Sequence, residues 1–201
     1  MALMLPRSVF FHIPKTGGTW VRQAIRNAGI PTVEVGPSPE DAENWHSPIS
    51  RVDVRGKFTF AFVRHPLGWY PSFWSHRMRR GWGRGDPLDR YMAAEFERFM
   101  WNVIGNAPGH LSRRFEIYTG PRPGALDFVG RQENLERDLL FALSQAGEEF
   151  EEGTILATPL KNTGSNLPGY APDLLGAVLE SESRAILRFG YACAGEVASP
   201  C

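Results

Sequence analysis

The sequence predicts an α/β sandwich with a mostly parallel sheet, built from one domain of 201 residues. Short apolar runs alternate along the chain with segments whose apolar residues recur at helical spacing, as they do in βαβ units. The run at residues 57–63 (Lys-Phe-Thr-Phe-Ala-Phe-Val) is apolar almost throughout, which is typical of a strand that is covered on both faces. No internal repeat or linker divides the chain, so we expect residues 1–201 to form a single domain.

The first strand, loop and helix follow one another at the N-terminus. Residues 9–13 are apolar and are followed by Pro14, which predicts a short buried strand. Residues 15–19 (Lys-Thr-Gly-Gly-Thr) then predict a loop. From Trp20 to Ala28, apolar residues recur at helical spacing, and Gly29 is the residue type that commonly ends a helix.

The rest of the chain continues the alternation. Further strands are expected at residues 30–35, 125–130 and 154–158, and further helices at residues 69–80, 86–104, 135–146, 171–180 and 182–189. Residues 36–49 and 105–124 contain several prolines or glycines and predict irregular connections. Residues 77–84 are basic and rich in glycine, and we expect there either a lid over an anionic ligand or a solvated surface loop.

The loop at residues 15–19 has the composition of an anion-binding cradle. Backbone N–H groups are free at the start of a helix, and the helix dipole adds positive potential there. Glycines let the backbone approach an anion closely, Lys15 adds a charge, and Thr16 and Thr19 add hydroxyl donors. The lysine precedes the glycines, so the loop is not a Walker A sequence. The alternative is an ordinary strand–turn–helix with a solvated lysine.

A second cationic position follows the strand at residues 57–63. Pro66 cannot continue a sheet ladder, so Arg64 should stand at the carboxyl end of that strand. In parallel α/β sheets, ligands bind at this edge. We therefore expect Arg64 to reach an anion, with the hydroxyl of Ser72 as an additional donor.

Composition excludes several classes of protein. Lys plus Arg equals Asp plus Glu at 22 residues each, so net charge gives no reason to expect a nucleic-acid partner. Cys193 and Cys201 are too few and too close to the terminus for a disulfide framework or a metal site. No apolar run has the length of a membrane span, and the N-terminus leaves no room for a signal peptide. These features predict a soluble cytoplasmic protein.

Five separated segments fit one known family. They are residues 14–20 (Pro-Lys-Thr-Gly-Gly-Thr-Trp), Arg64-His65-Pro66 together with Ser72, residues 128–135 (Phe-Val-Gly-Arg-Gln-Glu-Asn-Leu), the loop with Asn162 and Ser165, and Phe189-Gly190-Tyr191. Together they resemble the sulfotransferases that use 3′-phosphoadenosine 5′-phosphosulfate (PAPS). The resemblance is greatest to the branch that contains carbohydrate sulfotransferases and their small bacterial relatives.

The resemblance implies a P-loop-like three-layer sandwich with a central, mostly parallel sheet. It implies that residues 14–20 bind the 5′-phosphosulfate and that Arg64 and Ser72 bind the 3′-phosphate, which distinguishes PAPS from ATP. Lys15 would act catalytically at the leaving oxygen. The implied nucleotide-binding residues are Lys15, Thr16, Gly17, Gly18, Thr19, Trp20, Arg64, Ser72, Arg131, Asn162 and Ser165. PAPS is then a co-substrate that leaves as 3′-phosphoadenosine 5′-phosphate (PAP), and the chemistry requires no metal.

The acceptor hydroxyl needs a base, which in this family is a His or Glu between the phosphosulfate helix and the arginine strand. His46 occupies that interval and resembles the family's His-x-Pro variant. A neutral imidazole accepts a proton at neutral pH. Glu43 and Asp41 are the alternative bases. We expect His12 to pack or hydrogen-bond within the first strand and His65 to shape the turn after Arg64. His76, one helical turn beyond Ser72, either faces the acceptor site or lies at the surface, and we favour the surface position.

We therefore expect an enzyme that transfers the sulfuryl group from PAPS to a hydroxyl of a small-molecule, glycan or lipophilic acceptor. Its partners are the nucleotide and the acceptor, with no nucleic acid and no membrane span. One alternative is a P-loop kinase that uses ATP, which needs a metal-binding carboxylate at a strand end. The other is a nucleotide-binding module without catalysis. The sequence leaves the identity of the acceptor and the oligomeric state open.

Overall fold

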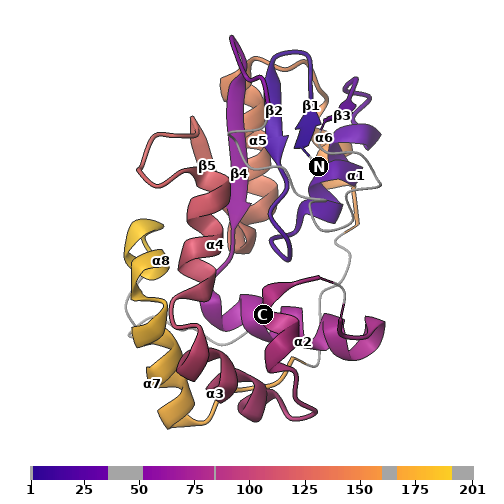
Figure 1. Ribbon diagram of the computed structural model, residues 1–201. Coiled ribbons are helices and arrows are strands. Elements are labelled where there is room, and N and C mark those ends of the chain that lie inside the picture. The colour runs from indigo at the N-terminus through magenta and orange to yellow at the C-terminus, as the bar shows by residue number, and fades with distance from the viewer. Residues whose placement is uncertain (1, 36–51, 84, 160–166, 192–201) are drawn as a thin grey trace.

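The computed structural model describes residues 2–35, 52–83, 85–159 and 167–191 of the chain (Figure 1). These residues form an α/β fold with a five-stranded sheet and eight α-helices. The predicted fold class is confirmed at this level. Residues 41, 43, 46, 162 and 165, all named above as site candidates, lie outside the described residues.

The sheet is mixed, with the strand order β3-β1-β2-β4-β5. Its strands are β1 (Ala2–Met4), β2 (Ser8–Phe11), β3 (Val33–Val35), β4 (Phe58–Val63) and β5 (Phe128–Arg131). The pairs β2–β4 and β4–β5 are parallel, whereas β1 runs antiparallel to both β2 and β3. The expectation of a mostly parallel sheet is therefore wrong for the N-terminal half. Strand β1 was missed because it has three residues, too few to show a period, before the turn closed by Leu5 N–H and the Ser8 carbonyl.

Helices cover both faces of the sheet (Figure 1). Their bounds are α1 (Gly18–Asn27), α2 (Pro66–Arg80), α3 (Phe96–Asn106), α4 (His110–Thr119), α5 (Leu135–Ala146), α6 (Glu152–Leu156), α7 (Pro172–Ser181) and α8 (Ser183–Arg188). Two 3-10 helices, η3 (Pro87–Tyr91) and η4 (Gln132–Asn134), precede α3 and α5. Helix α5 has the bounds predicted from the sequence, and Gly147 ends it with a positive φ of 68°.

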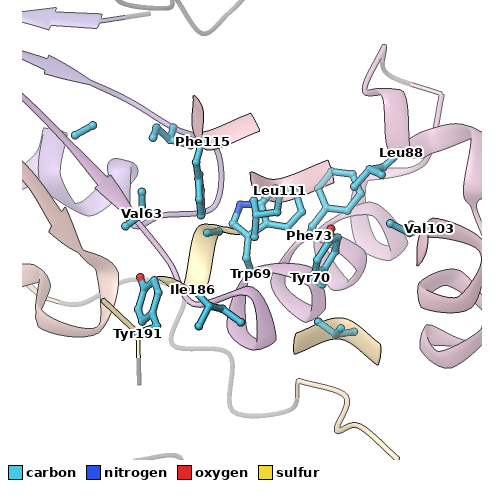
Figure 2. Packing of buried hydrophobic residues seen from close by; sticks show 14 of the residues in the cluster. Val63, Trp69, Tyr70, Phe73, Leu88, Val103, Leu111, Phe115, Ile186 and Tyr191 are labelled. Carbon is cyan, nitrogen blue, oxygen red and sulfur yellow. The ribbon is translucent and has the colours of Figure 1, made fainter. Parts of the chain in front are cut away.

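Alternate residues of the strands supply two apolar clusters, one on each face. Phe10, Phe60 and Phe62 pack with α1, α5 and α6, while Phe11 and Val63 join the cluster that contains α2, α4, α7 and α8. Figure 2 shows part of the second cluster, in which the aromatic side chains of α2 lie among residues of other helices. This two-sided burial explains why β4 is apolar at every position except Thr59.

Three segments differ from the sequence prediction. Residues 154–158 belong largely to α6 and are helical, and the single helix expected at 86–104 is divided into η3 and α3. The side chain of Asp86 accepts a hydrogen bond from Leu88 N–H and starts η3, and the extended backbone of Met92 ends it. Residues 77–80 are the last turn of α2, so the basic run is partly helical.

Helix α4 lies in the segment that was expected to be irregular. Its first turn is capped by the buried carboxylate of Glu182, which accepts hydrogen bonds from Leu111 N–H at 3.0 Å and Ser112 N–H at 2.8 Å. The cap comes from 70 residues away, so no local signal marks the helix start. Within the described ranges, no helix combines the length and apolarity that crossing a bilayer would need.

Candidate functional site

The loop after β2 and the residue after β4 leave the sheet at the same edge. In the parallel pair β2–β4, Phe11 lies opposite Ala61, so the chain reaches Pro14 and Arg64 three residues beyond one matched pair. The following helices then diverge, since α1 packs in one apolar cluster and α2 in the other. Adjacent parallel strands whose connections go to opposite faces create a crevice at their carboxyl ends, which is where α/β proteins bind ligands.

The backbone of the loop is strained at Lys15. Its φ is +66°, and it is the one residue other than glycine with a positive φ among the described residues. A side chain in this region costs roughly 1–3 kcal/mol and persists where the surrounding structure enforces it. Gly17 follows with a φ of +84° and begins α1, accepting from Trp20 N–H and Val21 N–H. In the described part of the chain, no side chain caps this helix start.

The two glycines of the loop are required by packing. A Cβ at Gly18 would overlap the imidazole of His12, and a Cβ at Gly17 would lie 2.6 Å from Leu135 Cδ2. The loop is therefore closed tightly over the end of β2 and the start of α5. Both positions therefore have a structural reason to be glycine that is independent of any ligand.

Side chains from α2 and from the loop itself fix the loop backbone. Trp69 Nε1 donates to the Pro14 carbonyl at 2.9 Å, and Thr16 Oγ1 donates to the Ile13 carbonyl at 2.9 Å. The indole of Trp20 donates to the Thr158 carbonyl, and its backbone N–H is taken by Gly17. The donor hydroxyl expected of Thr16 is thus used within the fold, and both donors of Trp20 are occupied. Thr19 is exposed in the first turn of α1.

Lys15 lies in a concentration of positive charge. Burial is the main reason that its pKa is lowered from 10.5 to about 8, and the charges of Arg64, Arg79 and Arg77 lower it further. Arg77 is paired with Asp89 at 2.8 Å, which offsets its charge, while Arg79 is exposed. Among the described residues, every charge that shifts Lys15 is therefore cationic, an arrangement that an anion would stabilise.

His76 belongs to the same concentration of charge. It lies one helical turn beyond Ser72 and is half-buried, where a surface position was expected. Burial lowers its pKa to about 4, helped by the charges of Lys15, Arg77, Arg79 and Arg80. The imidazole is consequently neutral at pH 7 and lies near Lys15. Its spacing of four residues from Ser72 is the sequence signal that could have placed it at the site.

Arg64 extends from the end of β4 along the start of α2. Its Nε would lie 2.9 Å from a Cβ at Gly68, and its Nη1 lies 3.5 Å from the Lys15 carbonyl, at the limit of a hydrogen bond. Burial lowers the pKa of Arg64, while the negative charge of Glu133 opposes that shift. Ser72 is half-buried one turn beyond Gly68 on α2, so it follows Arg64 along the same side of the helix.

Glu133 and Tyr191 fix the turn between β4 and α2. One carboxylate oxygen of Glu133 accepts from His65 N–H at 2.8 Å, and the other accepts from the Tyr191 hydroxyl at 3.1 Å. The imidazole of His65 caps α2 by accepting from Leu67 N–H, and burial lowers the pKa of His65. These contacts hold the backbone that immediately follows Arg64.

Arg131 ends β5 at the same edge of the sheet. It donates to the Gly190 carbonyl at 2.9 Å, and its guanidinium lies 5.1 Å from the ring centre of Tyr191. In the structure, Arg131 therefore holds the Gly190–Tyr191 segment against the sheet. Sequence reasoning named it as a nucleotide ligand and did not identify this contact.

The site gathers the cationic side chains of Lys15 and Arg64 at the carboxyl edge of the sheet. The described ranges contain no group of three or more His, Cys, Asp or Glu side chains placed to hold a metal ion. Comparison of the chain with protein-family models, curated proteins and solved structures finds no match in any of the three. The function is therefore inferred from these residues and their geometry.

Proposed function

We propose that the protein is a PAPS-dependent sulfotransferase with a P-loop-like three-layer fold. The observation that carries the proposal is Lys15, which has a strained backbone, a pKa lowered to about 8 and cationic neighbours at the crevice beyond β2 and β4. A lysine in such an environment gains charge stabilisation when a phosphate or phosphosulfate group binds beside it. Arg64, at the end of the next strand, supports a second anion site within the same crevice.

In the proposed reaction, the cationic side chains lie beside the atoms on which negative charge develops. An acceptor hydroxyl oxygen forms a bond to sulfur while the bond between sulfur and the bridging oxygen of the 5′-phosphate breaks. The bond's electron pair stays on that phosphate oxygen, and PAP leaves with the additional negative charge. Lys15 and the free N–H groups at the start of α1 stabilise this charge. Arg64 and Ser72 hold the 3′-phosphate, for which the guanidinium fork is well suited.

The proton of the acceptor hydroxyl passes to a base. His46 is our first candidate from the sequence and lies outside the described residues, as do Glu43 and Asp41. His76 is the second candidate, because the structure places its neutral imidazole near Lys15. Its pKa of about 4 is low for a base at pH 7, but bound PAPS would raise it through its negative charge.

The experiment that tests the proposal is an acceptor screen with PAPS labelled in the sulfuryl group. Small alcohols, phenols, sugars and lipophilic alcohols are incubated with the wild-type protein, and a parallel set receives labelled ATP with Mg²⁺. Transfer from PAPS that is lost in Lys15→Ala supports a sulfotransferase. Transfer from ATP alone supports a kinase. A cytoplasmic location remains a prediction from the sequence.

A further inference from the structure

Tyr170 carries a buried hydroxyl that the fold does not use. It is the second residue before α7, and its half-buried ring packs edge-on against Phe96, with the ring centres 5.2 Å apart. The hydroxyl oxygen is shielded from solvent and has no hydrogen-bond partner among the described residues. A buried polar group without a partner costs free energy, and such groups in folded proteins call for an explanation.

The neighbouring group of interest is the guanidinium of Arg64. Arg64 and Tyr170 are close enough that each affects the ionisation of the other. Within the described part of the chain, the one hydrogen bond of the Arg64 side chain is the 3.5 Å contact with the Lys15 carbonyl. In that same part of the chain, Glu133 accepts from His65 N–H and the Tyr191 hydroxyl and forms no hydrogen bond with Arg64.

Arg64 and Tyr170 do not satisfy each other. A guanidinium has donors and no acceptor, so the Tyr170 oxygen can accept from Arg64 but the phenol proton still lacks an acceptor. Burial raises the pKa of Tyr170 far more than the charge of Arg64 lowers it, so the phenol keeps its proton and stays a donor. A tetrahedral oxyanion between the two groups would accept from both, and it would also neutralise the buried charge.

We propose that the Tyr170 hydroxyl donates a hydrogen bond to the anion that Arg64 binds and so helps to select a ligand with a phosphate at this position. Under the proposed function this anion is the 3′-phosphate of PAPS, and that identification rests on the proposed function. The effect of each group on the pKa of the other shows that Arg64 and Tyr170 are neighbours, and the buried, unpartnered hydroxyl and the weakly bonded guanidinium leave both able to bind one anion.

The test compares two ligands that differ in one phosphate. Dissociation constants for PAP and for adenosine 5′-monophosphate, which lacks the 3′-phosphate, are measured by calorimetry on wild type and Tyr170→Phe. Loss of a hydrogen bond to a charged group predicts that PAP binds about 10- to 100-fold more weakly to the variant. Binding of the monophosphate stays within about twofold. The melting temperature without ligand is unchanged or higher, because the hydroxyl has no partner to lose.

The matched control is Tyr118→Phe. Tyr118 is also half-buried beside an arginine, Arg114, but that arginine is already paired with Asp86 at 2.8 Å. This variant should bind PAP as wild type does. Equal PAP affinity in wild type and Tyr170→Phe would overturn the inference, as would an equal loss for both nucleotides.

Failure of the proposed function would appear differently, as wild-type protein that binds neither nucleotide. In that case the inference is tested with inorganic phosphate as the ligand, and the rise in melting temperature on adding phosphate is measured. A rise in wild type that both Arg64→Met and Tyr170→Phe reduce supports the shared anion site. A rise that Tyr170→Phe leaves intact, or no rise in wild type, contradicts it.

Discussion

The indole nitrogen of Trp69 donates a 2.9 Å hydrogen bond to the carbonyl oxygen of Pro14. Trp69 lies in the first turns of α2, after β4, and Pro14 lies in the loop after β2. The bond therefore joins the two connections that diverge from the carboxyl edge of the sheet. It fixes the backbone immediately before Lys15, whose positive φ needs such support.

The first prediction follows from this bond. Trp69→Phe keeps an aromatic ring beside Phe73 but leaves the partly buried Pro14 carbonyl without its donor, which should cost about 1–3 kcal/mol of unfolding free energy. The loop should also become less well positioned, so PAP should bind more weakly. Trp74→Phe is the matched control, because the Trp74 indole donates to the Ala93 carbonyl at 3.0 Å from the same helix. If both variants lose the same PAP affinity, the bond has no special effect on the site.

The second prediction concerns the charge of Lys15. Its pKa in the fold, about 8, lies below its ordinary 10.5, so the unfolded chain binds more protons between these values. The free energy of unfolding should therefore rise with pH from about 8 to 10.5, and the cost of the buried cation is fully present below pH 8. Lys15→Met should be more stable than wild type at pH 7, with a smaller rise over that window.

The affinity for PAP should also depend on pH near the pKa of Lys15. PAP affinity of wild type should change little between about pH 7 and 8, where the phosphates of PAP are already ionised, and should fall above pH 8 as the free protein loses the Lys15 proton. Lys15→Met should bind weakly at every pH, without the inflection near 8. Denaturant titration and calorimetry from pH 6 to 10 measure the two quantities. A Lys15→Met variant that is less stable than wild type at pH 7 would contradict the placement of an uncompensated charge in this loop.

The third prediction tests the packing of the loop on β2. Gly18→Ala introduces a Cβ that overlaps the His12 imidazole, although alanine itself favours a helix start more than glycine does. The single variant should lose stability and PAP affinity. Adding His12→Ala to Gly18→Ala should restore part of both, because the overlap is removed. Additive losses in the double-mutant cycle would show that the two positions do not interact.

The fourth prediction separates the two histidines among the candidate bases. With an acceptor in hand, His46→Ala should lower kcat about 10²- to 10⁴-fold, the usual contribution of a general base. His76→Asn should lower kcat less than tenfold and change the pH dependence little. The reverse order of effects would assign the base to His76, which the structure places near Lys15.

Local patterns were sufficient for the elements that border the site. The bounds of β4 were predicted to within one residue, and those of α5 were predicted as observed. The sequence also placed Lys15 and Arg64 at the same edge of the sheet, where the structure has them. These follow from apolar periodicity, proline and glycine, and the geometry of parallel strands. The carboxyl edge could be located because Pro14 and Pro66 each end an apolar run.

Other features depended on distant residues. Helix α4 starts at a cap provided by Glu182, and β1 is defined by its pairing with β2 and β3. The nearness of His76 to Lys15 and of Tyr170 to Arg64 depends on how α2 leaves the sheet and how α7 packs against α2. Sequence spacing identifies the face of a helix, but the packing of one helix against another determines which side chains meet.

The central claim is that the crevice binds a nucleotide with phosphates at both the 5′ and 3′ positions. Calorimetric comparison of PAP with ADP, each with and without Mg²⁺, tests it most directly, since only PAP carries the 3′-phosphate. We predict that PAP binds at least tenfold more tightly than ADP, independently of Mg²⁺, and that Arg64→Met removes the difference. Equal affinity for the two nucleotides, or binding of ADP that depends on Mg²⁺, would contradict the assignment.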